Sequence, residues 1–278
     1  GQGHRTAYAQ VLAEKLGLDV DQITVKQGDT DLIPYGSGTG GSRSMPVGGA
    51  ALTDAADRLI AKGARIAAAK LGADAADIVF EDGAYRVVDA NKFLSFSDVA
   101  AASYQGGLPD DAEPRLEATG VFKPRAKTYP NGCHGCELEI DPDTGATTIL
   151  RYVVVDDFGT LINPQLVAGQ VHGGVVQGLG QALSEKTAFD AETGQMLSGS
   201  PLDYALPRAE DAPPIELIFA GTPCATHPMG LKGCGEAGAI GAPPAAIHAV
   251  LDALRPSGVT TIDMPATPLA IWTAIQTA

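Results

Sequence analysis

Hydrophobic residues recur every three or four positions in several segments, which is the spacing of an amphipathic helix. Glycine follows two of these segments as a stop signal, at Gly17 and Gly72. Asn163-Pro164 supplies an N-cap and a first-turn proline for another segment, and prolines open the last two. The pattern therefore predicts helices at about residues 8–16, 50–71, 97–103, 163–185, 244–254 and 268–277.

Alternation of apolar and polar residues, the pattern of a strand with one wet face, marks a hairpin in the middle of the chain. Cys136, Leu138 and Ile140 alternate with two glutamates, and the turn sequence DPDTG follows them. Further apolar runs complete a set of predicted strands at 23–25, 78–80, 85–88, about 136–140, 147–156 and 215–219. Because strands and helices alternate irregularly and hairpins recur, the predicted fold class is α+β, with mixed sheets and flanking helices.

Composition bounds the number of domains and the class of protein. The stretch 105–116 is rich in Gly, Pro and Asp and is the best candidate linker, so we expect two lobes, at 1–116 and 117–278. A net charge of −14 with scattered basic residues argues against a nucleic-acid partner. The sequence contains no run of 18 uninterrupted apolar residues, so no transmembrane helix is expected. Four cysteines make no disulfide framework in a chain of this length, and no signal peptide is visible, so a cytoplasmic protein is expected.

One carboxylate, Glu236, lies inside a glycine-rich run that leads into an apolar helix. Five glycines within twelve residues disfavour regular structure there, since each costs about 1 kcal/mol against alanine in a helix. Such a run is typical of backbone that approaches a ligand closely, and a carboxylate without bulky neighbours suits a base. A flexible turn would explain the run equally well.

Three further segments have the composition of ligand-binding loops. GQGH at 1–4 could hold an anion at a helix start, although an ordinary capping loop is the simpler interpretation. GSGTGGSRS at 36–44 offers backbone donors, hydroxyls and a guanidinium to a phosphate, or is a flexible loop. The helix at 163–185 carries five glycines, and its glutamines Gln170, Gln177 and Gln181 project on nearly one stripe, which fits either a pterin edge or tight packing with solvated glutamines.

The CxxC sequence at 133–136 does not predict a metal centre. It lacks the second pair of ligands that structural zinc and iron–sulfur sites require, and it falls on an alternating strand. His172, His227 and His248 are scattered along the chain and are expected to be structural. We therefore predict no protein ligands to a metal.

Together these segments resemble the second half of the molybdenum-binding subunit of the xanthine oxidase family of hydroxylases. The matching sequences are GQGH at 1–4, GDTD at 28–31, GSGTGGSRS at 36–44, INPQLVAGQVHGGVVQGLGQAL at 162–183 and LKGCGEAGAIGAPPAAIHAVLDAL at 231–254. The resemblance implies the molybdopterin-binding fold of these enzymes and oxidative hydroxylation of an aldehyde or N-heterocycle with oxygen from water. It also implies that Glu236 is the catalytic base.

The resemblance further implies a molybdenum–pyranopterin cofactor, with the cytosine dinucleotide form favoured. Its contacts would be Gln2, Gly3, His4, Ser42, Arg43, Ser44, Gln170, Gly173 and Gln177, with Lys232 helping to neutralise phosphate. Arg5 stands where the family commonly has glutamate, which alters local charge but not the backbone.

The family's preceding half is absent from this chain, as are its [2Fe-2S] and FAD modules. We therefore expect a hetero-oligomer with the missing half and with iron–sulfur and flavin subunits, with dimerisation as an option. The alternative is a non-catalytic cofactor-binding or structural subunit of such a complex.

Overall fold

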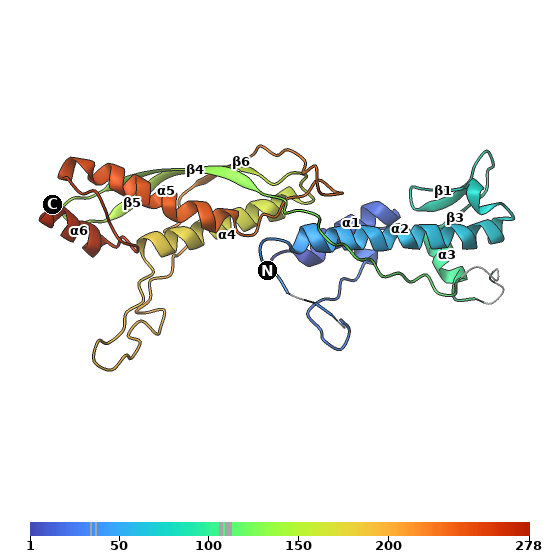
Figure 1. Ribbon diagram of the computed structural model, residues 1–278, viewed down its shortest axis with the longest axis horizontal. Coiled ribbons are helices and arrows are strands. Elements are labelled where there is room, and N and C mark those ends of the chain that lie inside the picture. Colours follow the sequence, from blue (N-terminus) through green and yellow to red (C-terminus); the bar gives the residue numbers. More distant parts are fainter. Residues whose placement is uncertain (34, 37, 106–107, 109–112) are drawn as a thin grey trace. The chain divides into compact units, whose positions relative to one another are not determined.

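The computed structural model describes residues 1–33, 35–36, 38–105, 108 and 113–278 (Figure 1). The chain folds as two compact units, and each is described by itself. The first contains Gly1, Gly3–Lys127 and Ala225–Met229, and the second contains Gln2, Thr128–Cys224 and Gly230–Ala278. Much of the predicted linker at 105–116 lies outside the described residues, and the lobe boundary after residue 116 stays a prediction.

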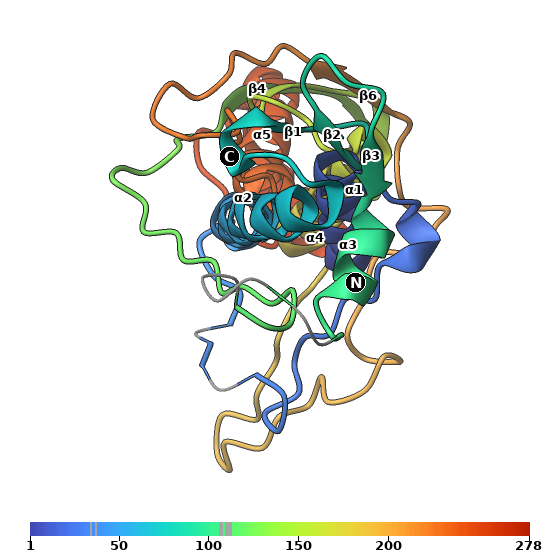
Figure 2. The same cartoon turned by 90° about the vertical axis from the view of Figure 1, so that its right-hand side faces the viewer.

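The first unit is built on two helices and a small sheet. Helices α1 (His4–Leu16) and α2 (Ser44–Leu71) pack together, and each ends at a glycine in the left-handed conformation. Strands β1 (Ile78–Glu81), β2 (Ala84–Val87) and β3 (Phe93–Ser95) form an antiparallel sheet, which faces the viewer in Figure 2 beside α3 (Phe96–Ala102). The core of this unit centres on Ile66, Ala67, Tyr85 and Val99.

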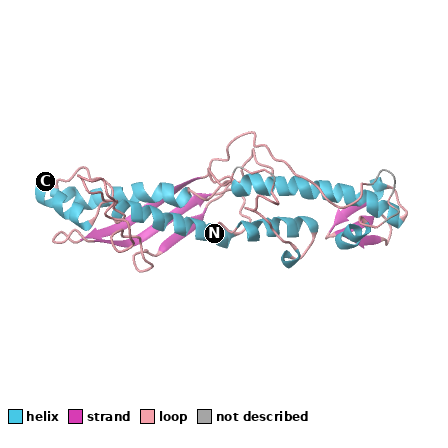
Figure 3. Cartoon of the chain, turned by 90° about the horizontal axis from the view of Figure 1, so that it is seen from below, coloured by secondary structure: helices cyan, strands magenta, loops and turns pink. Residues whose placement is uncertain are grey.

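The second unit places helices against a mixed sheet of order β4-β5-β6. Strands β4 (Asn131–Ile140) and β5 (Thr147–Asp157) are antiparallel, whereas β6 (Ile215–Phe219) runs parallel to β5. Helices α4 (Pro164–Leu183) and α5 (Ala237–Leu254) lie side by side, and α5 also contacts β4 (Figures 1 and 3). Helix α6 (Pro268–Thr277) packs with the end of α5 in a second cluster. The main core joins residues of β5, α4 and α5, among them Tyr152, Val154, Val171, Val175 and Ala246.

Most predicted elements are confirmed, but one is absent and several begin earlier than predicted, among them α1 at His4 and β4 at Asn131. No strand forms at 23–25; the chain there follows a short 3-10 helix, Val20–Gln22, and none of the described residues pairs with it. Helix α2 begins at Ser44 rather than at residue 50, because Pro46 fits a first helical turn. Helix α5 begins at Ala237 rather than at residue 244, so Pro243 and Pro244 lie inside it.

Helix α5 bears on the prediction that no segment of the chain spans a membrane. Within the described residues one stretch, 237–257, is long and apolar enough to do so by composition alone. Its apolar side chains Ala242, Ala246, Val250 and Leu254 are buried in the two cores of the second unit. Packing within the unit therefore accounts for one face of this helix, since 33% of the stretch is buried.

Candidate cofactor and catalytic site

Glu236 is the residue that immediately precedes helix α5. Its carbonyl accepts the first helical hydrogen bond, from the amide of Ile240 at 2.9 Å, and its side chain is exposed. The first-turn N–H groups and the aligned peptide dipoles of an 18-residue helix therefore begin beside this carboxylate. An anion at this end of a helix is electrostatically favoured.

The glycines of α4 divide into a packed face and an open face. A Cβ atom added at Gly174 would lie 2.9 Å from the amide nitrogen of Ala239, and one at Gly178 would lie 2.7 Å from Cβ of Ala242. From the opposite helix, a Cβ on Gly238 would lie 2.5 Å from the carbonyl oxygen of Val171. Tight helix packing, the alternative left open by the sequence, is therefore the reason for these glycines.

The open face of α4 carries the other glycines and the glutamines. Gly169 and Gly173 are exposed, and a Cβ atom at either would meet nothing within 4 Å. Gln177 is exposed and Gln170 is half-buried on the same face. Each such glycine costs the helix about 1 kcal/mol without any packing gain inside the chain. These residues form an open strip along α4 that a flat ligand could approach closely. The open strip begins at the turn of α4 that contacts α5.

In the first unit the structure brings His4 together with Ser44. The rings of His4 and Tyr8 stack with centroids 5.4 Å apart, and the Tyr8 hydroxyl donates to the carbonyl oxygen of Ser44 at 2.9 Å. Oγ of Thr39 and Oγ of Ser44 are 2.8 Å apart, which ties the glycine-rich loop to the same place. Ser37 of that loop lies outside the described residues.

The starts of α1 and α2 are therefore neighbours, and neither cap residue, Gly3 or Arg43, makes a side-chain cap. Ser42 adopts a left-handed backbone with φ of 52°, which is uncommon for a residue with a side chain and is often found at binding sites. Burial lowers the pKa of His4, although a hydrogen bond with the side chain of Gln27 acts in the opposite direction.

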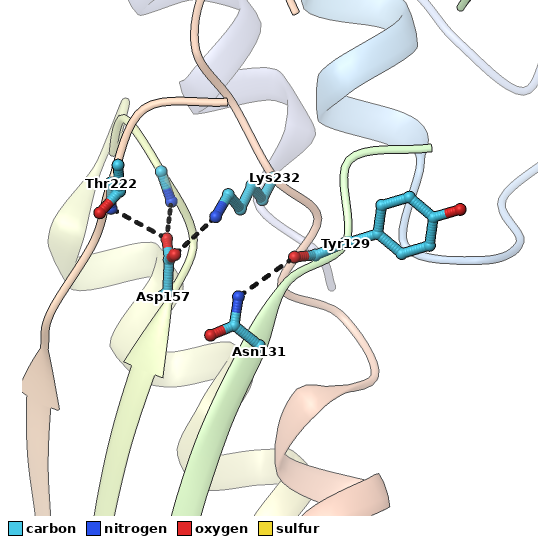
Figure 4. A network of polar contacts seen from close by, with 6 residues as sticks. Tyr129, Asn131, Asp157, Thr222 and Lys232 are labelled. Atoms are coloured by element: carbon cyan, nitrogen blue, oxygen red, sulfur yellow. Dashed lines mark hydrogen bonds and ion pairs between the residues drawn. The ribbon is translucent and has the colours of Figure 1, made fainter. Parts of the chain in front are cut away.

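Lys232 is paired with a carboxylate that the sequence analysis did not single out. Its Nζ lies 2.5 Å from Oδ2 of Asp157, while Oδ1 of Asp157 accepts from the amides of Gly159 at 2.9 Å and Thr222 at 3.1 Å (Figure 4). Burial would raise the pKa of Asp157, but these hydrogen bonds outweigh it and hold that pKa below its ordinary value. The sequence does contain a signal for this carboxylate, because two aspartates directly follow the apolar run 153–155.

The neighbouring Asp156 points to the opposite face of β5 and is buried, with 2% of its surface exposed. Its Oδ2 has no hydrogen-bond partner within the part of the chain that the structure describes, and Nε2 of His134 lies 4.0 Å from Oδ1. Nδ1 of His134 is 2.9 Å from the Tyr152 hydroxyl. Burial raises the pKa of Asp156 from 3.8 to about 6, and it lowers that of His134.

This buried carboxyl predicts a specific pH dependence of stability. Because Asp156 holds its proton more tightly in the folded state, the free energy of unfolding should fall as pH rises from about 4 to above 6. Asp156→Asn should remove this fall and raise the unfolding free energy at pH 8 by an amount on the order of 1–3 kcal/mol. Urea unfolding at pH 5 and pH 8 measures the difference, and an unchanged pH slope in the variant would contradict the assignment.

The two cysteines of the CxxC sequence lie on opposite faces of β4. Cys133 is exposed, whereas Cys136 packs against the main core, where burial raises its pKa to about 11. Alternation along a strand places residues three apart on different faces, so these thiols diverge. His227, predicted to be structural, is buried in the first unit with Nε2 donating to the carbonyl of Pro46 at 2.9 Å.

Comparison with known proteins identifies the family of this chain. A family model described as the molybdopterin cofactor-binding domain matches residues 1–213. The chain belongs to this family. Within it, the domain is 41% identical over 277 residues to the carbon monoxide dehydrogenase large chain of Hydrogenophaga pseudoflava, covering 99% of this chain and 34% of that one. It is 40% identical to the nicotine 6-hydroxylase large subunit of Paenarthrobacter nicotinovorans, covering 96% and 33% of the two chains.

Solved structures agree with the sequence comparison. Carbon monoxide dehydrogenase from Oligotropha carboxidovorans superposes with a TM-score of 0.91 at 39% identity, over 99% of this chain and 34% of that one. The α+β molybdopterin-binding fold implied by the resemblance is therefore confirmed. The domain spans about a third of the length of the relatives it matches, rather than the half that the motifs suggested.

Proposed function

We propose that this domain is the C-terminal third of the molybdenum-binding subunit of a molybdenum hydroxylase. The observation that carries the proposal is the open strip on α4, where Gly173 and the glutamines face outward beside the start of α5. Among the described residues, no atom would meet a Cβ at Gly169 or Gly173 within 4 Å, whereas a cofactor lying against the helix would account for these glycines. The relatives named above are large chains of oxidoreductases, which supports the same function.

The proposed contacts to the pyranopterin are grouped by the unit to which each residue belongs. In the second unit they are Gln170, Gly173 and Gln177, whose amides can both donate to and accept from a heterocycle edge. Gln2, which belongs to the second unit, is a further proposed contact. In the first unit the proposed contacts are Gly3, His4, Ser42, Arg43 and Ser44, where two helix starts and a guanidinium suit the phosphates of a dinucleotide, proposed to be the cytosine form.

Glu236 would act as the base. When bound, the molybdenum cofactor supplies a two-electron oxidation and the transfer of oxygen derived from water. The chain's own contribution is a carboxylate oxygen, at the start of α5, that accepts a proton during the reaction. The substrate class proposed is an aldehyde or an N-heterocycle.

The complete enzyme would need partners. The preceding part of the subunit would complete the substrate pocket, and iron–sulfur and FAD subunits would take the electrons, in a cytoplasmic hetero-oligomer. A cofactor-binding subunit without catalysis remains the alternative, and the Glu236 variant described in the Discussion separates the two.

Molybdenum analysis and pterin fluorescence on the chain purified with its native partner polypeptides test the proposal. We expect about one molybdenum and one pterin for each copy of the chain, and CMP after acid hydrolysis if the dinucleotide is the cytosine form. Gln177→Leu should lower the cofactor content, because it removes an amide from the open strip. A complex that turns over without molybdenum or pterin would overturn the proposal.

A further inference from the structure

The segment that carries Glu236 is tied to the end of strand β5 through its backbone. The amide of Lys232 donates to the carbonyl of Phe158 at 3.0 Å, and the amide of Thr160 donates to the carbonyl of Gly230, also at 3.0 Å. Gly159 and Leu231 form the bridge between these two bonds. These hydrogen bonds fix the position at which the segment leaves the end of β5.

The side chain of Asp157 joins three pieces of chain at this point. It binds the ammonium of Lys232, the amide of Thr222 beyond β6 and the amide of Gly159 beyond β5 (Figure 4). Only three residues separate Lys232 from Glu236, and Gly238 is locked against α4 two residues later. A displacement of Lys232 would therefore be transmitted to the carboxylate over a very short tether.

Burial distinguishes this ion pair from its counterpart on the same strand. The side chains of Lys232 and Asp157 are 11% and 14% exposed, whereas those of Arg151 and Glu216, which are 2.7 Å apart, are 61% and 52% exposed. Removing one partner of a buried pair leaves an uncompensated charge, while an exposed pair is screened by water. The two pairs make a matched comparison.

We propose that Asp157 and Lys232 are positioning residues that fix the segment 232–236, and with it the carboxylate of Glu236. The proposal rests on the proposed role of Glu236 as the base. It gives Lys232 a structural task in place of the phosphate contact expected from the sequence, because its ammonium is nearly buried and already bound by a carboxylate.

The test compares Asp157→Asn, Lys232→Met and the double variant in the complete complex, with Glu216→Gln as the control for an exposed pair. Hydrogen exchange of the amides in 230–236 should quicken by at least about tenfold in all three variants and stay unchanged in the control. The kcat should fall by about 10–100-fold with KM nearly constant, because a displacement of about 1 Å is enough for such a loss. Molybdenum content should not change, and the double variant should resemble each single one.

Conservative replacement supplies a second check. Lys232→Arg keeps the charge and a donor to Asp157, so it should restore most of the exchange protection and of kcat relative to Lys232→Met. Loss of molybdenum in Lys232→Met but not in Asp157→Asn would show a phosphate contact and overturn the proposal. Unchanged exchange in both single variants would overturn it as well.

These outcomes are distinguishable from a failure of the proposed function. If exchange quickens in the pair variants while Glu236→Gln remains active, the pair fixes the segment but Glu236 is not the base. The exchange measurement does not depend on turnover, so it tests the pairing on its own.

Discussion

Glu236→Gln is expected to lower kcat/KM by about 10³-fold or more while leaving molybdenum content and folding stability unchanged. A positioned general base contributes about 10²–10⁴-fold to rate, and glutamine keeps the size of the side chain but cannot accept a proton at the same oxygen. The Glu236 side chain is exposed, so its replacement should change stability by no more than about 0.5 kcal/mol. Steady-state kinetics with metal analysis on the same preparation measures both effects.

Glu139→Gln is the appropriate control, because Glu139 is an exposed glutamate on β4 of the same unit. It should leave kcat/KM within about twofold of the unmodified enzyme. Turnover of the Glu236 variant near the unmodified rate, at full molybdenum content, would remove the base role and favour the non-catalytic alternative.

Elements with strong local signals were predicted from the sequence, and elements that depend on a distant partner were not. The hairpin strands β4 and β5 follow from alternation and a turn motif, and α4 follows from Asn163, whose Oδ1 accepts from the amide of Leu166 at 2.9 Å. The start of α5 differs from the prediction because Pro244 has the signature of a first helical turn, whereas the helix begins at Ala237. Pro243 and Pro244 are accommodated inside the helix, where Pro243 lies over Gly178.

The candidate site shows the same contrast between local signals and contacts with distant partners. The roles of Glu236 and of the glutamines of α4 stay predictions, and they could be proposed from the sequence because continuous motifs carry these residues. The partnership of Lys232 with Asp157 joins residues 75 positions apart, so no local pattern reports it. The opposite pKa shifts of Asp156 and Asp157 depend on which face of β5 each carboxylate occupies, which only the packed sheet determines.

The two adjacent glycines Gly173 and Gly174 have opposite environments, which the sequence could not distinguish. Gly174→Ala should lower the free energy of unfolding by about 1–3 kcal/mol, since its new Cβ would press on the backbone of Ala239 and Gly238 at 2.9 and 3.0 Å. Gly173→Ala should raise it by up to about 1 kcal/mol, because the new methyl meets open space and alanine favours the helix. Urea unfolding of the cofactor-free chain measures both changes.

The more stable of the two variants, Gly173→Ala, should be the more impaired one when cofactor content is measured in the complete complex. Gly173→Ala puts a methyl group on the strip proposed to contact the pyranopterin, so molybdenum content should fall although the chain itself is more stable. A stabilised Gly173→Ala variant with full cofactor content would show that the open face of α4 serves some other contact. Equal destabilisation by the two alanines would instead contradict the division of α4 into a packed and an open face, on which the location of the cofactor depends.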